Sequence, residues 1–347
     1  MRFGLLLLLL GSTVTIFGQK NNAKWIEKDR VFDSIYNSHF NQFRKPNSFL
    51  NFAKTPNNKR IIGTAVGLGG AYVSGMVFLD RLWYAGYPRS KFHWFNDLNE
   101  WNQIDKGGHI IGAYTESNFA YQWYRWCGAN RRDAAIYGAL TGFVAQSSIE
   151  IFDGFSSKWG ASWSDIAANG IGSLAAMSQN LAWGEQRIQL KIAVHLQPYP
   201  HGELGTRANE LFGTGLVNTF FKDYNNIDYW VCVNPWAFRK ESKFPKWLNI
   251  AVGYGAGNLY GGFDNTWTDK NGVFHNRKDQ TRYRKFFISI DYNLMHVKAH
   301  TRVGRLLLGA LNFIKLPAPA IEFNTLGQVV FHPCYFLNME MPIYLKK

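Results

Sequence analysis

Three short groups of polar side chains in the first half of the chain have types and spacings that suit chemistry. In the first, Asp105 and His109 lie four residues apart in DKGGH, so on a helix they share one face. A carboxylate and an imidazole on one face can act as a general acid/base pair or supply two metal ligands. The structural alternative is that Asp105 caps a helix and holds His109 in place.

The second group is Glu150 and Asp153, three residues apart near the expected end of an apolar helix. The helix dipole disfavours negative charge at a C-terminus, so a nearby group should offset this cost. Lys106, His109, a metal ion or water could do so. The alternative is a helix end that reaches solvent, with Asp153 opening a turn.

The third group lies in WGASWSDIAANGIG, residues 159–172. Ser164 is the expected N-cap of a helix, with Asp165 in its first turn and Asn169 one turn later. Trp159 and Trp163 belong either at a membrane interface or at the edge of a core. Asp165 as a simple cap is the less demanding interpretation.

Four apolar segments must position these groups: 61–79, 106–123, 134–152 and 164–183. The first has nineteen residues without a charge, which is long enough to cross a bilayer. The alternative for it is a buried helix of a soluble bundle. In an antiparallel bundle, the polar groups at the helix ends would converge at one place. The candidate catalytic residues there are Asp105, His109, Glu150, Asp153 and Asp165, and the candidate ligand-binding residues are Lys106, Trp163 and Asn169.

From about residue 185 the pattern changes to period-2 alternation in 187–197, 247–257, 283–293, 320–324 and 327–337. Segments 207–224 and 303–315 have helical spacing. These patterns predict an α+β portion with five or six strands, too few for a complete outer-membrane barrel. The glycine-rich stretch GYGAGNLYGG, residues 253–262, lacks the Lys-Ser/Thr of a phosphate-binding loop.

The N-terminus predicts export. Arg2 precedes a run of leucines, and residues 1–18 have the pattern of a cleaved signal peptide. No cysteine follows the leucine run, so we expect no lipid anchor. The expected domains are a polar lead-in at 19–60, an apolar helical domain at 61–184 and a strand-rich domain at 185–347. The three cysteines have neither metal-site nor redox spacing.

Composition favours a membrane partner. The chain has a net charge of +14 and is 46% hydrophobic and 16% aromatic. Export argues against nucleic acid, so an anionic lipid or lipopolysaccharide surface is the better partner for this charge. The alternative is that the dispersed basic residues only form a solvated surface. An envelope protein is a second kind of partner.

The three groups together resemble the YfiM-like family of predicted periplasmic lipoproteins, a domain of unknown function. The resemblance covers about residues 100–182. The order of the three groups is also distantly similar to that in VanZ-like membrane proteins. The stretches KDYNNIDYW and FPKWLNIAVGYG are similar to longer envelope proteins of Bacteroidota. The missing lipoprotein cysteine is a departure from the family. The matching positions are Asp105, Lys106, His109, Glu150, Asp153, Gly160, Ser162, Trp163 and Asp165.

The sequence therefore predicts an α+β protein with an N-terminal apolar bundle of about four helices, membrane-associated or membrane-embedded, and a strand-rich C-terminal portion. We expect an exported, membrane-associated envelope protein with a structural or interaction role and no required cofactor. The alternative is an envelope enzyme or lipid-handling protein that uses the His109–carboxylate group, with or without a divalent metal ion. The residues do not decide between them.

Overall fold

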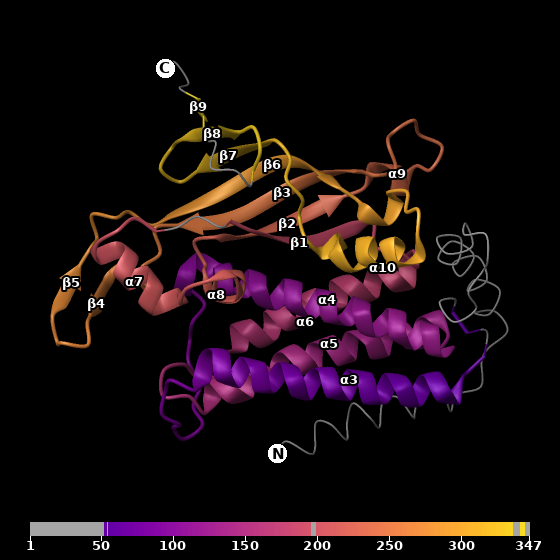
Figure 1. Cartoon of the computed structure of the whole chain (residues 1–347), viewed down its shortest axis with the longest axis horizontal. Helices are drawn as coiled ribbons and strands as arrows, with labels where there is room; N and C mark the ends of the chain where they lie inside the picture. The colour runs from indigo at the N-terminus through magenta and orange to yellow at the C-terminus, as the bar shows by residue number, and fades with distance from the viewer. Residues whose placement is uncertain (1–51, 54, 196–198, 336–340, 344–347) are drawn as a thin grey trace. The chain divides into compact units, whose positions relative to one another are not determined.

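The computed structural model describes residues 52–53, 55–195, 199–335 and 341–343 (Figure 1). The chain forms two compact units. Unit 1 comprises Met1–Asn96, Gly112–Gln186 and Lys298–Leu307, and unit 2 comprises Asp97–Ile111, Arg187–Val297 and Leu308–Lys347. The expected signal peptide and most of the lead-in at 19–60 lie outside the described residues. The division at residue 184 stays a prediction.

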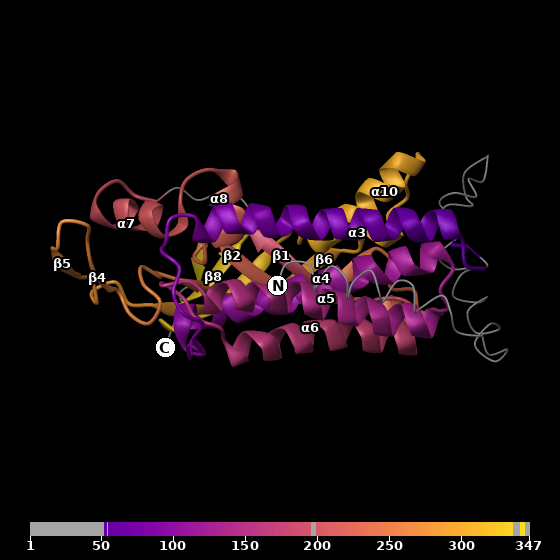
Figure 2. The same ribbon diagram turned by 90° about the horizontal axis from the view of Figure 1, so that it is seen from below.

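Unit 1 is helical. It contains α3 (Asn58–Leu79), the π-helical turn η1 (Asp80–Tyr84), the larger part of α4 (Ile104–Cys127), α5 (Arg131–Gly154) and α6 (Trp163–Ala182). The axes of these long helices are roughly aligned (Figures 1 and 2). The side chains of Asn57, Asn130 and Ser162 cap α3, α5 and α6 by accepting backbone N–H groups. The four apolar segments thus form helices close to their expected limits.

Apolar character is uneven among these helices. Among the described residues, only the stretch Asn58–Tyr84 is long and apolar enough to cross a membrane, with a mean hydropathy of 1.6. The expected four-helix apolar bundle is therefore not confirmed. The other helices contain buried polar side chains, among them Ser117, Arg125, Arg131, Asp133, Thr141, Glu150, Asp165, Asn169 and Asn180.

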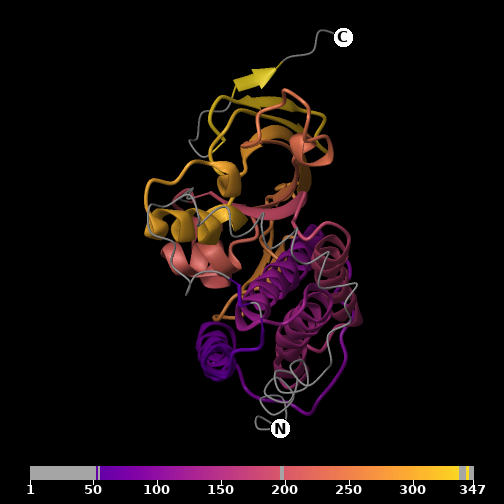
Figure 3. The same cartoon turned by 90° about the vertical axis from the view of Figure 1, so that its right-hand side faces the viewer.

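Unit 2 is built on a seven-stranded sheet in which every neighbouring pair is antiparallel, in the order β1-β2-β3-β6-β7-β8-β9. The strands are β1 (Ile188–Val194), β2 (Ile227–Val233), β3 (Leu248–Gly257), β6 (Tyr283–Tyr292), β7 (Ala320–Asn324), β8 (Val329–His332) and β9 (Met341–Ile343). A hairpin of β4 (Thr266–Thr268) and β5 (Phe274–Asn276) stands apart from this sheet. In Figure 3 the sheet curls around one of its faces, called here the inner face.

The strands are connected by the short helices α7 (Glu203–Phe212), α8 (Leu216–Lys222), α9 (Pro235–Phe238) and α10 (Arg302–Ala310) and by the single turns η3 (Leu294–His296) and η4 (Leu311–Phe313). A further turn, η2 (Glu100–Gln103), directly precedes α4. The predicted α+β class is confirmed. The predicted strands are present, but the described residues hold nine strands instead of five or six. The additional ones are β2 and three strands of only three residues each.

The first turns of α4 belong to unit 2 and pack on the outer face of β1 and β2. Ile104 and Ile111 form an apolar cluster with Ile227 and Tyr229. Gly107 is required there, because a Cβ at this position would overlap the Tyr229 ring. This contact fixes the DKGGH segment against the sheet.

Candidate functional site

Asp105 and Lys106 lie in the first turn of α4 within an acidic cluster of unit 2. The Tyr224 hydroxyl donates to Asp105 Oδ1 at 2.8 Å. Lys106 Nζ lies 2.8 Å from Asp97 Oδ1 and 3.1 Å from Asp105 Oδ2. Lys106 therefore neutralises carboxylates of its own unit. His109 is half-buried one turn further along α4.

The same cluster contains a carboxyl group that the sequence did not single out, Glu100. Burial raises its pKa, and the negative charges of Asp105 and Asp97 raise it further, to about 7. A carboxyl group with this pKa exchanges protons near neutral pH. The start of α4 can thus support acid/base chemistry.

In unit 1, Glu150 joins the end of α5 to the start of α6. Its buried carboxylate accepts the Ser162 backbone N–H at 2.8 Å through Oε2. Ser162 Oγ in turn accepts the Asp165 N–H at 3.2 Å, so Ser162 is the N-cap of α6. The prediction of Ser164 as the cap is wrong. Ser164 Oγ instead lies 2.8 Å from the Ser162 hydroxyl.

The remaining predicted residues of unit 1 have different surroundings. Tyr84 donates to Asp153 Oδ1 at 2.8 Å, and the fully buried Asn169 donates to Ser147 Oγ at 3.3 Å. Trp163 is 66% exposed and stacks on Trp94 with a centroid distance of 4.1 Å. The carboxylates of this unit thus flank a helix–helix junction. Their convergence with Asp105 and His109 of unit 2, with or without a divalent metal ion, stays a prediction.

Replacing Glu150 by Ala should lower the free energy of unfolding by about 1–3 kcal/mol, because the buried Ser162 N–H loses its acceptor. Glu150→Gln, which keeps an acceptor oxygen, should lower it less. Urea unfolding followed by circular dichroism measures both. A Glu150→Ala protein as stable as the wild type would show that the junction does not depend on this carboxylate.

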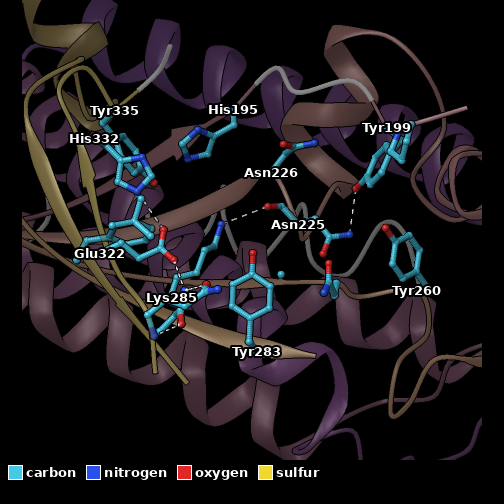
Figure 4. A pocket seen from close by; sticks show the side chains of 17 residues that line it. His195, Tyr199, Asn225, Asn226, Tyr260, Tyr283, Lys285, Glu322, His332 and Tyr335 are labelled. Carbon is cyan, nitrogen blue, oxygen red and sulfur yellow. Dashed lines mark hydrogen bonds and ion pairs between the residues drawn. The ribbon is translucent and has the colours of Figure 1, made fainter. Parts of the chain in front are cut away.

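A second polar site, which sequence reasoning missed, lies on the inner face of the unit 2 sheet. It is a cavity of about 250 Å³ (Figure 4). Its walls come from β3, β6, β7, β8 and the segments that follow β1, α8, β3, β7 and β8. The lining residues include His195, Tyr199, Asn225, Asn226, Asn258, Tyr260, Tyr283, Lys285, Phe287, Glu322, Asn324, Gln328, His332 and Tyr335.

Asp228 on β2 is the centre of the charge network behind this cavity. It is fully buried, and its carboxylate lies 2.8 Å from His195 Nε2 and 3.1 Å from Lys285 Nζ. The Tyr335 hydroxyl donates to the same carboxylate. Burial raises the pKa of Asp228, but the Lys285 charge and the hydrogen bonds from His195 and Tyr335 outweigh it and bring the pKa to about 2.

Lys285 and Asp228 form an ionised pair. Burial lowers the pKa of Lys285, but the Asp228 charge outweighs burial, so its pKa lies above the ordinary value. A second carboxylate, Glu322, faces His332 Nε2 at 3.1 Å and accepts from Asn324 at 2.9 Å. The cavity is therefore bordered by two separate His–carboxylate pairs.

The glycines of β3 make room for this network. Gly253, Gly255 and Gly257 alternate along the strand, so all three face the inner side. A Cβ at Gly253 would lie 2.9 Å from the Trp230 ring, and at Gly255 it would overlap Asp228 and Lys285. A Cβ at Gly257 would overlap the Tyr283 ring. The GYGAG motif is thus explained by close packing on a strand.

A further ion pair occupies the inner face beyond the cavity. Lys191 and Asp291 are 2.8 Å apart with both side chains fully buried. Asn249 donates to Asp291 at 3.0 Å, and Lys191 donates to the Tyr292 carbonyl at 2.9 Å. In the sequence, Lys191, Lys285 and Asp291 stand at alternate positions of strand-like segments, a pattern that differs from the helix-end motifs of the first half of the chain.

Comparison with known families matches residues 93–180 to a family model described as "Predicted periplasmic lipoprotein (DUF2279)". This range includes all the residues singled out in the first half of the chain. The match supports an exported protein that is periplasmic or membrane-associated, and it assigns no role. Comparisons with curated proteins and with solved structures found no match. The YfiM-like, VanZ-like and Bacteroidota parts of the resemblance stay predictions.

Proposed function

We propose that this chain is an exported cell-envelope protein that binds a membrane surface through exposed apolar faces and has a structural or interaction role there. The observation that carries the proposal is the outer face of the unit 2 sheet. That face carries apolar side chains on β2, β3, β6, β7 and β9, each 37–56% exposed. They are Val231, Ile250, Val252, Phe286, Ile288, Ile290, Ile321, Phe323, Met341 and Ile343; we call them the apolar band.

Strand register makes the apolar band continuous. Val252 pairs with Val231 on one side and with Ile288 on the other, and Ile288 pairs with Ile321. In the next row, Phe286 pairs with a residue of β3 on one side and with a residue of β7 on the other. Directly paired side chains on one face lie about 4.5–5.5 Å apart at Cβ, so these rows touch. A contiguous exposed apolar surface of this kind marks an interaction site.

The polarity of the sheet favours lipid over water as the partner of this face. An antiparallel sheet in water normally buries its apolar face and exposes its polar one. Here the inner face buries the Asp228–Lys285 and Lys191–Asp291 ion pairs, while the apolar band is exposed. Apolar-out and polar-in alternation is the pattern of strands whose outer face meets acyl chains.

Unit 1 has an apolar surface of its own. On α3, Ile62, Val66, Val73 and Val77 are 47–69% exposed and recur at helical spacing. Only 11% of the apolar stretch is buried, which argues against a core helix. Aromatic residues at the end of this stretch, Trp83 and Tyr84, pack edge-to-face on Trp159 and suit the headgroup region, and the net positive charge suits anionic lipid.

Val252→Glu should reduce binding to vesicles that contain anionic phospholipid by at least about tenfold, because a charge would enter the centre of the apolar band. Val273→Glu is the matched control. Val252 is 52% exposed and Val273 is 53% exposed, but Val273 lies in the β4–β5 hairpin, outside the apolar band. Co-flotation with vesicles measures both, and equal binding of the two variants would contradict the proposal.

The second candidate function is an envelope enzyme or lipid-handling protein that uses the start of α4. The observation that favours it is the pKa of Glu100, which is about 7. Glu100 interacts electrostatically with Asp105, and Asp105 and His109 both lie in the first turns of α4. Under this function, Glu100→Gln would leave unfolding unchanged and abolish the envelope phenotype of the protein. Under the structural function, Glu100→Gln would abolish the phenotype only if it also lowered the free energy of unfolding of the protein.

A further inference from the structure

The charged side chains that border the inner cavity of unit 2 already have partners in its wall. The Asp228 carboxylate is paired with Lys285, and the Glu322 carboxylate is hydrogen-bonded to His332 and Asn324. A charged ligand in such a site would lose its hydration without gaining an opposite charge of its own. The cavity therefore favours a neutral ligand.

The polar atoms that face the cavity belong mostly to groups that can both donate and accept hydrogen bonds. Phenol hydroxyls come from Tyr199, Tyr260 and Tyr283, and side-chain amides come from Asn225 and Asn258. Figure 4 shows the hydroxyls of Tyr260 and Tyr283 directed into the open space. Ligand hydroxyl groups, which also donate and accept, are the natural partners of such walls.

Two polar groups of the cavity wall, on Tyr260 and Gln328, have hydrogen-bonding capacity left. Within the described part of the chain, the Tyr260 hydroxyl makes no hydrogen bond, although the residue is only 6% exposed. Gln328 accepts from Asn324 through Oε1 at 3.1 Å, while its amide nitrogen has no partner among the described residues. By contrast, Asn225 is held by the Leu259 backbone and Tyr199, so it forms a fixed part of the wall.

Aromatic rings complete the cavity. Tyr283 packs over Gly257, which fixes the position of its ring on the β3 backbone. Tyr260 approaches from the loop after β3 (Figure 4). Rings of this kind offer flat apolar faces beside the polar groups, and such a mixture suits a ligand with C–H surfaces and hydroxyl edges.

We propose that this cavity binds one neutral sugar ring, a hexopyranose unit, either free or as the headgroup of a glycolipid. The volume of about 250 Å³ holds on the order of a dozen water-sized groups, which suits one ring with its hydroxyls. It is below the roughly 300–1,000 Å³ of sites for larger ligands. The affinity expected for so small a ligand is on the order of millimolar.

The test is isothermal titration of the full chain, in a detergent without a sugar headgroup, with methyl glucoside, methyl galactoside and N-acetylglucosamine. At least one should bind saturably, and glucuronate should bind at least about tenfold more weakly because it is charged. Tyr260→Phe should weaken binding about fivefold or more, because it removes one hydrogen bond. Tyr87→Phe, an exposed tyrosine of unit 1, is the matched control and should bind like the wild type.

Vesicles of glucosyl diacylglycerol and vesicles of plain phosphatidylcholine distinguish the two sources of the sugar. If the wild type prefers the glycolipid vesicles and Tyr260→Phe abolishes this preference, the sugar is a lipid headgroup. If the methyl glycoside binds and glycolipid vesicles do not compete with it, the sugar is free. No saturable binding of any neutral sugar, or glucuronate binding as tight as glucoside, would overturn the proposal. So would unchanged binding by Tyr260→Phe. Val252→Glu should bind sugar normally, so this test is separate from membrane binding.

Discussion

Asp228→Ala is expected to lower the free energy of unfolding of unit 2 by about 3–5 kcal/mol. The substitution leaves the Lys285 charge buried without its partner and removes the acceptor of His195 and Tyr335. Hydrogen exchange of peptides from β2 and β3 would measure the loss locally. Asp279→Ala is the matched control: Asp279 also forms an ion pair, with Arg277 at 2.9 Å, but both groups are on the surface and little change is expected.

The pH dependence of stability provides a second readout of Asp228. Its pKa is about 2 in the folded protein against an ordinary 3.8, so the folded state binds this proton less readily than the unfolded state. The stabilisation is complete above about pH 4 and is lost as the pH falls towards 2, by about 2–3 kcal/mol in all. Asp228→Asn should remove this part of the acid dependence. An unchanged acid transition, or a stable Asp228→Ala protein, would contradict the buried ion pair.

Gly255→Ala is expected to destabilise unit 2 by about 3 kcal/mol or more, although it adds a single methyl group. That methyl would overlap the Asp228 carboxylate and the Lys285 side chain, so either the ion pair separates or β3 shifts. Urea unfolding monitored by circular dichroism provides the measurement. Gly86→Ala is the control, since a Cβ there would meet no atom within 4 Å. Equal stability of the two variants would show that β3 has room for side chains on its inner face.

Local signals in the sequence were sufficient to predict most of the helices and strands. The uncharged run at 61–79 predicted α3, and the alternation around Lys191 predicted β1. The cap of α6 was misplaced by two residues because Ser162 and Ser164 both fit. Ser162 is followed three residues later by Asp165, and this spacing is the signal that distinguishes them.

The inner cavity could not be predicted from local signals. Asp228, Lys285 and Glu322 lie on three strands far apart in the sequence, and only the antiparallel register brings their side chains to one face. Alternation alone does not tell which face of a strand is buried. Charged residues at alternate positions were therefore consistent with an ordinary solvated face, which is the opposite of what the structure contains.

The apolar band is the central feature of the proposed function, and spin labelling tests it most directly. In a Cys334→Ser background, which leaves only the buried Cys127 and Cys232, a nitroxide at Ile288→Cys is compared with one at Val273→Cys in anionic vesicles. The label at 288 should collide more with oxygen than with a water-soluble nickel chelate, because oxygen concentrates in lipid, and the label at 273 should show the reverse. Greater exposure of the 288 label to the nickel chelate would contradict the account.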